Sequence, residues 1–246
     1  METKTHKNVV LISGGTSGIG KAVLLRLLSE GHFVATFAPE TEEEGDCAKE
    51  FLQNHSEQLL FLKGDVQSDS DVKQVVEKTI EKFGKIDVLI NNAGVPYYVE
   101  CDQVDAKKFL MVLDINLVGP ARLIKEVVPG MKSRGEGLII NMVSTAGLHA
   151  NARSECYSAT KFGLRGFSQA IRSELREFGI KVATISPGVA NTKFLGPEME
   201  QRTHKEHSLL ETEDIARVIS FIVDQPKRAE VRDIILTPFG SDRYHM

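Results

Sequence analysis

Seven short apolar runs recur along this chain, and longer segments with the periodicity of amphipathic helices separate them. The runs span residues 8–12, 33–37, 58–62, 88–90, 138–143, 181–185 and 233–236. Short strands that are apolar throughout and alternate with helices predict a parallel sheet covered on both faces. Right-handed crossovers then give a doubly wound, three-layer α/β/α arrangement with a seven-stranded, mainly parallel sheet. Its ligand site is expected at the carboxyl ends of the strands.

Composition and charge narrow the functional classes. The 246 residues are 41% hydrophobic and 26% charged, as in a soluble protein with a sizeable core. The net charge of −4 gives no electrostatic reason to expect binding to nucleic acid or to an anionic membrane. We find no internal repeat and no linker in the sequence, so we expect one domain over residues 1–246.

The cysteines and the amino terminus favour a cytoplasmic protein. Cys47, Cys101 and Cys156 are odd in number and lack the spacing of a disulfide framework or a metal site, as expected of reduced thiols. The first residues form no apolar signal-peptide core, and no apolar run in the sequence is long enough to span a bilayer.

A glycine-rich turn follows the first apolar run and leads into a helical segment. Gly14 permits a tight turn, Gly18 lets the backbone approach a pyrophosphate, and Gly20 allows close packing of helix on strand. N–H groups at the start of the helix and the helix dipole favour an anion there. A turn without a ligand is the alternative, but the strand–turn–helix context favours a dinucleotide. The candidate residues are Ser13, Gly14, Thr16, Ser17, Gly18, Ile19 and Gly20.

Tyr157 and Lys161 are four residues apart in a helical segment, which places a phenol and an ammonium on one face. A free tyrosine has a pKa of about 10, and a nearby cation moves this pKa toward neutrality. Such a pair can exchange a proton with a carbonyl or alcohol oxygen while hydride moves elsewhere. Taken alone, the spacing also fits an amphipathic helix that carries one Tyr and one Lys by chance.

The Gly-x-x-x-Gly-x-Gly spacing from Gly14 to Gly20, combined with Tyr157-x-x-x-Lys161, resembles the short-chain dehydrogenase/reductase family. The resemblance runs from about residue 7 to about residue 238, nearly the whole chain. It implies a single Rossmann-fold domain that transfers hydride between a nicotinamide dinucleotide and a carbonyl or alcohol substrate.

The resemblance assigns four catalytic residues, and each position holds the expected residue type. It implies that Tyr157 is the acid/base, that Lys161 lowers its pKa and binds the nicotinamide ribose, and that Ser144 orients the substrate oxygen. Asn116 is the fourth residue, at a kink that would hold a water linked to Lys161. The alternative for Asn116 is a core asparagine with satisfied hydrogen bonds.

The resemblance also implies dinucleotide contacts at the ends of later strands. Asp65 would accept a hydrogen bond from the adenine amino group beside the Val66 backbone, although an ordinary loop aspartate is the alternative. Asn92, Ala93 and Gly94 belong to an Asn-Asn-Ala-Gly element that combines structural with cofactor contacts. The residues expected around the nicotinamide are Pro187, Gly188, Val189 and Thr192.

The end of the second apolar run bears on the choice between NADP and NAD. An acidic side chain there would bind the ribose 2′-hydroxyl, whereas an arginine would accept a 2′-phosphate. The resemblance places these two markers at Ala38 and Pro39, so both are absent. The missing carboxylate favours NADP(H) over NAD(H). Glu40 and the acidic residues 42–44 would favour NAD(H) unless they form a solvated loop.

Two segments and a lid are expected to surround the substrate. Residues 95–98 and 148–156 would form walls, and residues 193–210 the lid. The adjacent Tyr97 and Tyr98 fit either a pocket wall or loop packing, and Arg153 fits a surface residue better than a binder of acidic substrates. His204 and His207 lack a third ligand in the sequence, so no metal is expected. The resemblance implies a homodimer or homotetramer formed through helices 107–131 and 155–178.

These observations favour an NADP(H)-dependent carbonyl reductase or alcohol dehydrogenase acting on a small molecule. The nearest alternative keeps the chemistry and uses NAD(H). A dinucleotide-binding sensor without turnover is a different class, disfavoured by the complete set of Ser144, Tyr157, Lys161 and Asn116. A flavodoxin-like, phosphate-binding regulator would leave the Tyr/Lys pair unexplained.

Overall fold

The computed structural model describes residues 7–39, 57–195 and 209–240, and a seven-stranded sheet forms its centre. The strands follow the spatial order β3-β2-β1-β4-β5-β6-β7, and each neighbouring pair is parallel. They are β1 (Val9–Ser13), β2 (Phe33–Ala38), β3 (Leu59–Lys63), β4 (Val88–Asn91), β5 (Gly137–Met142), β6 (Ile180–Pro187) and β7 (Asp233–Leu236). Every predicted strand is present, which confirms the doubly wound class.

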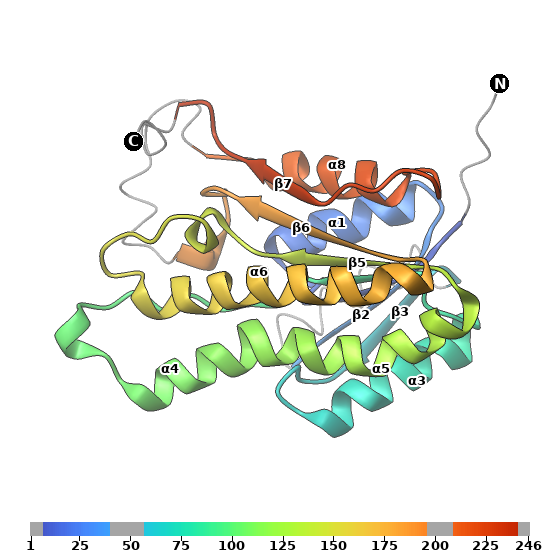
Figure 1. Ribbon diagram of the computed structural model, residues 1–246, viewed down its shortest axis with the longest axis horizontal. Helices are drawn as coiled ribbons and strands as arrows, with labels where there is room; N and C mark the ends of the chain where they lie inside the picture. The colour runs from blue at the N-terminus through green and yellow to red at the C-terminus, as the bar shows by residue number, and fades with distance from the viewer. Residues whose placement is uncertain (1–6, 40–56, 196–208, 241–246) are drawn as a thin grey trace.

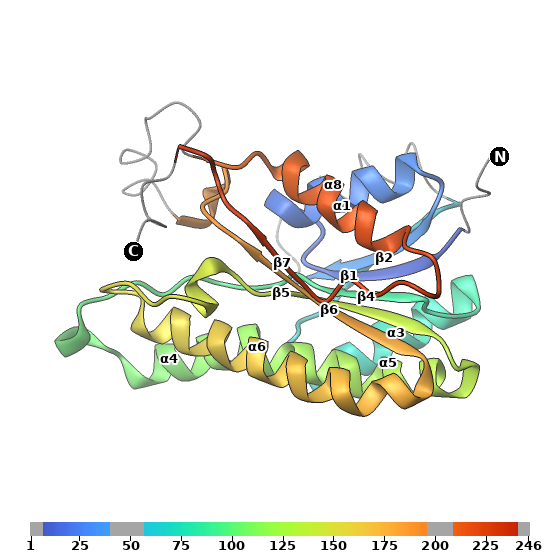
Figure 2. The same cartoon turned by 45° about the horizontal axis from the view of Figure 1, so that its top comes forward.

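Helices cover both faces of the sheet, as Figures 1 and 2 show. One face carries α1 (Gly18–Ser29) and α8 (Thr212–Val223), side by side. The other carries α3 (Asp69–Phe83), α4 (Ala106–Leu113), α5 (Gly119–Arg134) and α6 (Glu155–Leu175). Short helical turns lie at η1 (Cys101–Gln103), η2 (Asp114–Val118), η3 (Thr145–Gly147), η4 (Arg176–Phe178) and η5 (Lys193–Leu195).

Alternate residues of each central strand supply two separate apolar layers. In β1, Val10 and Ile12 pack toward α1 and α8, whereas Leu11 packs toward α3, α5 and α6. All three side chains are fully buried. Because both faces of the strand are covered, its first four residues are apolar throughout instead of alternating with polar ones.

A π-helical turn, η2, separates α4 from α5. The Gly119 N–H donates to the Asp114 carbonyl, five residues earlier, where an α-helix would use the carbonyl four residues earlier. The sequence predicted an interruption near Gly119 and Pro120, and the structure places it just before them. Asn116 is fully buried at the centre of this turn.

Some predicted features cannot be located. Residues 196–208 hold most of the predicted lid with His204 and His207, and they lie outside the described residues, as do Glu40, residues 42–44 and Cys47. In the described part of the chain, no helix combines the length and the apolar content needed to cross a membrane.

Candidate functional site

Many of the candidate site residues lie at or after the carboxyl ends of four strands. Ser13, Asn91, Met142 and Pro187 are the last residues of β1, β4, β5 and β6. Because these strands are parallel, their ends lie along one edge of the sheet. The fold therefore brings the glycine turn, the Asn-Asn-Ala-Gly element and the segments after β5 and β6 to the same edge.

The glycine turn has the backbone geometry expected of a dinucleotide-binding junction. Gly14 and Gly18 have φ angles of 69° and 49°, a left-handed conformation that other residues rarely adopt. A methyl group built on Gly20 would lie 2.0 Å from the Gly14 carbonyl oxygen. Only glycine at position 20 therefore lets α1 approach the turn this closely.

The N-terminus of α1 differs from those of α3 and α4 because no side chain caps it. Ser17 forms no capping hydrogen bond, and the first turn contains no acidic residue. By contrast, Ser68 caps α3 and Asp105 caps α4. The first N–H groups of α1 thus lack a side-chain acceptor, which suits a phosphate.

Asn92 fixes the glycine turn against the end of β4. Its Nδ2 donates to the carbonyl oxygens of Ser13 at 3.1 Å and Gly14 at 2.9 Å. The Ser13 hydroxyl accepts from the backbone N–H groups of Asn92 and Ala93, both at 3.1 Å. Ser13, a predicted cofactor contact, is buried and uses its side chain within the protein.

Thr36 on β2 also supports the turn, and we did not predict it from the sequence. Its hydroxyl accepts from the Gly15 N–H at 3.0 Å and donates to the Ile12 carbonyl at 2.9 Å. A methyl group built on Gly15 would lie 2.4 Å from this hydroxyl. The available signal was a threonine in an apolar strand beside the turn, because a buried hydroxyl needs partners.

Ser144, Tyr157 and Lys161 lie together beside the same edge. Ser144 follows β5 and interacts with the side chain of Tyr157, which lies in the first turn of α6. Lys161 Nζ lies 5.7 Å from the centroid of the Tyr157 ring and donates to the Met142 carbonyl at 2.8 Å. Tyr157 is 5% exposed and Lys161 is 4% exposed.

Burial dominates the protonation of this pair. It raises the pKa of Tyr157 above its ordinary value, Tyr98 adds to this effect, and the hydrogen bond with Ser144 opposes it. Burial also lowers the pKa of Lys161 to about 8. The net pKa of Tyr157 thus lies above its ordinary value, while the lowering effect assigned to Lys161 stays a prediction. The Lys161 ammonium donates to the Met142 carbonyl, and loss of hydration is the largest influence on the Tyr157 phenol.

Asn116 holds the segment after β4 against η2 and α6. Its Oδ1 accepts from the Val95 N–H at 2.8 Å, and its Nδ2 donates to the Val95 carbonyl at 2.9 Å and to Thr160 at 3.1 Å. A methyl group built on Gly94 would lie 3.2 Å from Asn116 Oδ1 and 3.6 Å from Lys161 Nζ. The structure thus brings Asn116, Gly94 and Lys161 together, while the water linking Asn116 to Lys161 stays a prediction.

Two aromatic side chains cover the Tyr157 ring. The Tyr98 ring lies 5.7 Å away between centroids, and the Phe194 ring lies 5.9 Å away in an edge-to-face arrangement with Tyr157. Tyr97 is buried instead, and its hydroxyl accepts from the Asp105 N–H at 2.9 Å. Tyr98 therefore lines the site and Tyr97 supports the loop. Phe194 was not predicted, because a single aromatic residue in a polar segment gives no sequence signal.

Asp65 and Val66 follow β3, two strands from β1. The Asp65 carboxylate accepts from the backbone N–H of Gln67 at 2.9 Å and from its side chain at 3.2 Å. Val66 is buried, and its carbonyl accepts from Arg122 at 3.3 Å. Both residues thus lie at the edge where the adenine end of a dinucleotide is expected, with contacts inside the protein.

The end of β2 carries no carboxylate and lies beside a lysine. Ala38 is buried and pairs in register with Lys63, an exposed residue at the end of β3. In parallel strands, register partners project to the same face of the sheet. The cationic Lys63 side chain therefore lies next to Ala38, the position expected to distinguish NADP from NAD.

The segment after β6 closes against the glycine turn. The Gly188 N–H donates to a carbonyl of β7 at 2.8 Å, and the Val189 carbonyl accepts from the Leu210 N–H at 2.9 Å. A methyl group built on Gly18 would lie 3.4 Å from Thr192 Cγ2. The predicted nicotinamide-binding residues thus reach the turn predicted to bind pyrophosphate.

The predicted wall 148–156 is tied to the segment after β4. The Val99 N–H donates to the Arg153 carbonyl at 3.0 Å, and the Arg153 side chain pairs with Glu100 at 3.0 Å. The Arg153 side chain is 51% exposed, which agrees with a surface role. Within the described ranges, no cluster of three or more His, Cys, Asp or Glu residues is suited to a metal ion.

Comparisons with known proteins point to one family. The family model for short chain dehydrogenases matches residues 8–203. An uncharacterized oxidoreductase of Staphylococcus saprophyticus is 30% identical over 94% of this chain and 97% of its own. A farnesol dehydrogenase of Aedes aegypti is 32% identical over 94% of this chain and 96% of its own. The closed form of serine dehydrogenase complexed with NADP+ has a TM-score of 0.89 at 25% identity, covering 97% of this chain and 98% of its own.

Proposed function

The chain belongs to the short-chain dehydrogenase family and is an oxidoreductase of that type, and we propose that it transfers hydride between NADP(H) and a carbonyl or secondary alcohol. The observation that carries this proposal is the grouping of Ser144 and Tyr157 beside the buried Lys161. This group lies at the sheet edge that also carries the glycine turn, so proton transfer and hydride transfer can meet at one carbon–oxygen bond.

Each residue of the group has a distinct role in the proposal. Tyr157 gives a proton to the substrate oxygen in reduction and takes it back in oxidation. Its raised pKa keeps the phenol protonated at neutral pH, which suits the donor role. Ser144 donates a hydrogen bond to the same oxygen and shares the negative charge that develops there. Lys161, with a pKa of about 8, is mostly charged at neutral pH and returns a proton to the site.

The residues present fit a dinucleotide. The uncapped start of α1 and the glycine turn would hold the pyrophosphate, whereas Lys161 and the segment from Gly188 to Thr192 would hold the nicotinamide end. When bound, the nucleotide supplies or accepts the hydride. Two features support NADP(H). Ala38 presents no carboxylate to a 2′-phosphate, and Lys63 stands beside it as a cation.

A titration with two nucleotides tests the proposal. Purified protein is titrated with NADPH and, separately, with NADH while nicotinamide fluorescence is followed, and ketones, quinones, keto-esters and aldehydes are then added. We expect tighter binding of NADPH and its oxidation by at least one carbonyl class. Tight binding without turnover across the panel would favour the sensor. Absence of binding for both nucleotides would overturn the proposal.

Two substitutions test the nucleotide preference separately. Ala38→Asp should move the NADPH:NADH preference toward NADH by at least about tenfold, because a carboxylate repels the 2′-phosphate. Lys63→Ala should weaken NADPH binding and leave NADH binding unchanged, whereas Lys73→Ala, on the exposed side of α3, should change neither. An unchanged preference in both test variants would refute the assignment of this strand end.

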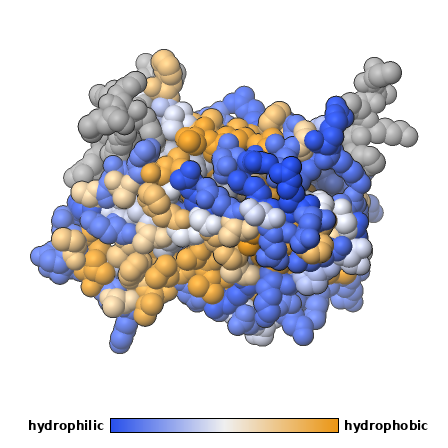
Figure 3. All heavy atoms as spheres, in the orientation of Figure 1, coloured by the Kyte–Doolittle hydropathy of each residue, from blue (hydrophilic) through white to orange (hydrophobic). Residues whose placement is uncertain are grey.

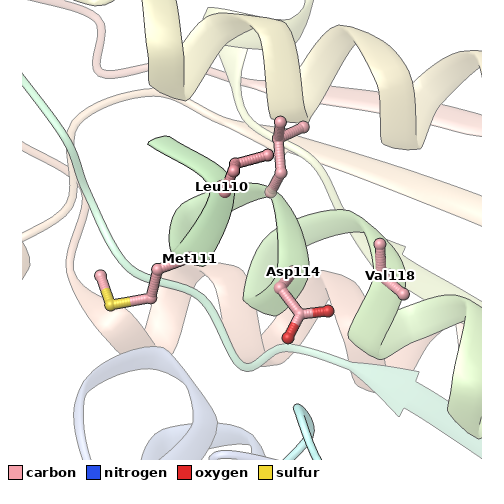
Figure 4. Close-up of a pocket in the computed structure, with 5 residues that line it drawn as sticks. Leu110, Met111, Asp114 and Val118 are labelled. Carbon is pink, nitrogen blue, oxygen red and sulfur yellow. The ribbon is translucent and has the colours of Figure 1, made fainter. Parts of the chain in front are cut away.

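We also propose a homodimer formed through α4, η2 and the adjoining face of α6. Figure 3 shows apolar side chains gathered over α4 and α6. Leu110, Met111, Val118 and Phe162 are 40–64% exposed, and the first three line a depression on α4 and η2 (Figure 4). Apolar patches of this spread are uncommon on monomers, and a two-fold contact would cover the same helices of both copies at once.

Sedimentation velocity tests the dimer. Leu110→Glu should shift the protein to a monomer, because it would bury two like charges at the two-fold contact. Leu25→Glu, a matched change on the exposed side of α1, should leave the dimer intact. A monomeric wild type, or a Leu110→Glu variant that stays dimeric, would contradict this interface.

A further inference from the structure

Three aromatic rings from three distant segments meet at the reacting centre. Tyr98 belongs to the loop after β4, Tyr157 to the first turn of α6, and Phe194 to η5. The Tyr98 and Phe194 rings approach the Tyr157 ring at 5.7 Å and 5.9 Å between centroids. Their interplanar angles with Tyr157 are 48° and 62°, so both are inclined to the phenol and neither is stacked flat on it.

Tyr98 is held in place by its two neighbours in the chain. On one side, Tyr97 is buried and its hydroxyl accepts from the Asp105 N–H. On the other side, the Val99 N–H donates to the Arg153 carbonyl at 3.0 Å. Anchors on both sides fix the backbone of Tyr98, so its ring is preorganised at the site.

Phe194 is positioned from the opposite part of the chain. Its backbone N–H donates to the Thr192 hydroxyl at 3.4 Å. Thr192 in turn lies next to Gly18 of the glycine turn. Phe194 therefore approaches Tyr157 from the segment that closes over the glycine turn, whereas Tyr98 approaches from the loop after β4.

Exposure shows which surface an incoming molecule meets. Tyr157 is 5% exposed, whereas Tyr98 is 38% exposed and Phe194 is partly buried. Among the described residues, these two rings are the aromatic side chains next to Tyr157, so a carbonyl compound bound at its hydroxyl lies close to them. From this geometry we infer that Tyr98 and Phe194 determine specificity, and that the preferred substrate carries its carbonyl on a planar, unsaturated ring packed against them.

This inference rests on the proposed reductase function and adds the class of substrate. Aromatic rings gain from edge-to-face and offset packing with each other beyond the burial of their area. A puckered saturated ring of the same size buries similar area and lacks this gain. Two favourable ring contacts correspond to a kcat/KM on the order of tenfold or more higher for the planar unsaturated ring than for the saturated one.

A matched pair of ketones tests the inference by kinetics. Acetophenone and cyclohexyl methyl ketone share a carbon skeleton and differ in the planarity of the ring. Conjugation with the ring changes the intrinsic reactivity of acetophenone. The readout is therefore the kcat/KM of acetophenone divided by that of cyclohexyl methyl ketone, compared between each variant and the wild type. Tyr98→Leu and Phe194→Leu should each lower this ratio several-fold. Tyr98→Phe keeps the ring, so it should leave the ratio near that of the wild type.

A binding measurement keeps the test independent of turnover. Tyr157→Phe retains the central aromatic ring but lacks the hydroxyl that would donate a proton. Its complex with NADP+ can be titrated with each ketone by calorimetry. We expect tighter binding of acetophenone, and loss of this preference when Tyr98→Leu is added. The inference would be overturned if the two ketones bound with equal affinity or if neither bound. It would also be overturned if the preference for acetophenone survived both leucine changes. In each of these cases NADP+ would still bind. Failure to bind NADP+ would instead refute the proposed function.

Discussion

Replacing Lys161 with methionine tests how burial controls the reacting group. Lys161 is 4% exposed, and burial lowers its pKa from 10.5 to about 8. This change in pKa means that the charged form costs the folded protein about 3 kcal/mol. Lys161→Met removes that cost, but it also leaves the Met142 carbonyl without its donor, which costs about 1–3 kcal/mol. At pH 7 the two effects nearly offset, and the variant should be as stable as the wild type or slightly more stable.

The pH dependence isolates the first effect. Because the pKa is lower in the folded protein, the unfolded chain binds more protons between about pH 8 and 10.5, so Lys161 makes the wild type more stable as pH rises. Between pH 7 and pH 10 this gain amounts to about 2.5 kcal/mol in the free energy of unfolding. The variant lacks it and should therefore be clearly less stable than the wild type at pH 10.

Urea unfolding without added nucleotide measures this difference at both pH values. All other titrating groups are common to the two proteins and cancel in the comparison. Lys125→Met, at a lysine whose side chain is 72% exposed, should show no pH-dependent difference from the wild type. If Lys161→Met followed the pH dependence of the wild type, the ammonium would not be buried as the structure has it, and the reasoning would be refuted.

Two further predictions concern the turn and the sheet. Gly20→Ala should lower the free energy of unfolding by about 1–3 kcal/mol and weaken NADPH binding, because its methyl group would overlap the Gly14 carbonyl. Gly130→Ala, on α5, where a methyl group would meet only the Arg134 side chain at 3.4 Å, should instead be close to neutral in the same denaturation and binding assays. Burial opposes the charge of Asp233, but hydrogen bonds from Arg172 and Thr184 outweigh it and hold its pKa below the usual range. Asp233→Asn should therefore lower stability at pH 7, and this deficit should shrink as pH falls below about 4, which acid titration of both proteins would check.

The fold followed closely from the sequence because the central strands are buried on both faces. Val10, Leu11 and Ile12 are all apolar for this reason, and the other central runs are mostly apolar, with Thr36, Asn141 and Thr184 as buried polar exceptions. The glycine turn was equally readable, because the conformations of Gly14 and Gly18 and the close approach at Gly20 exclude other residues. The interruption of the long helix lies slightly before its predicted position, because Gly119 and Pro120 mark the start of α5 and not the π-helical turn itself.

The electrostatics of the site could not be predicted, because they depend on contacts between distant segments. The spacing of Tyr157 and Lys161 indicates that a cation lies near the phenol. It does not indicate that Tyr98 and Phe194 cover the ring, or that the ammonium donates to Met142. These contacts bury both groups and reverse the expected direction of the Tyr157 pKa.

The most direct test of the account compares the wild type with Tyr157→Phe in nucleotide binding and in single-turnover oxidation of bound NADPH by a ketone that the wild type reduces. The account predicts a similar NADPH dissociation constant and a rate lower by about 10²–10⁴, because only the proton donor is lost. A variant that kept most of the wild-type rate would contradict the assignment of Tyr157 as the acid/base.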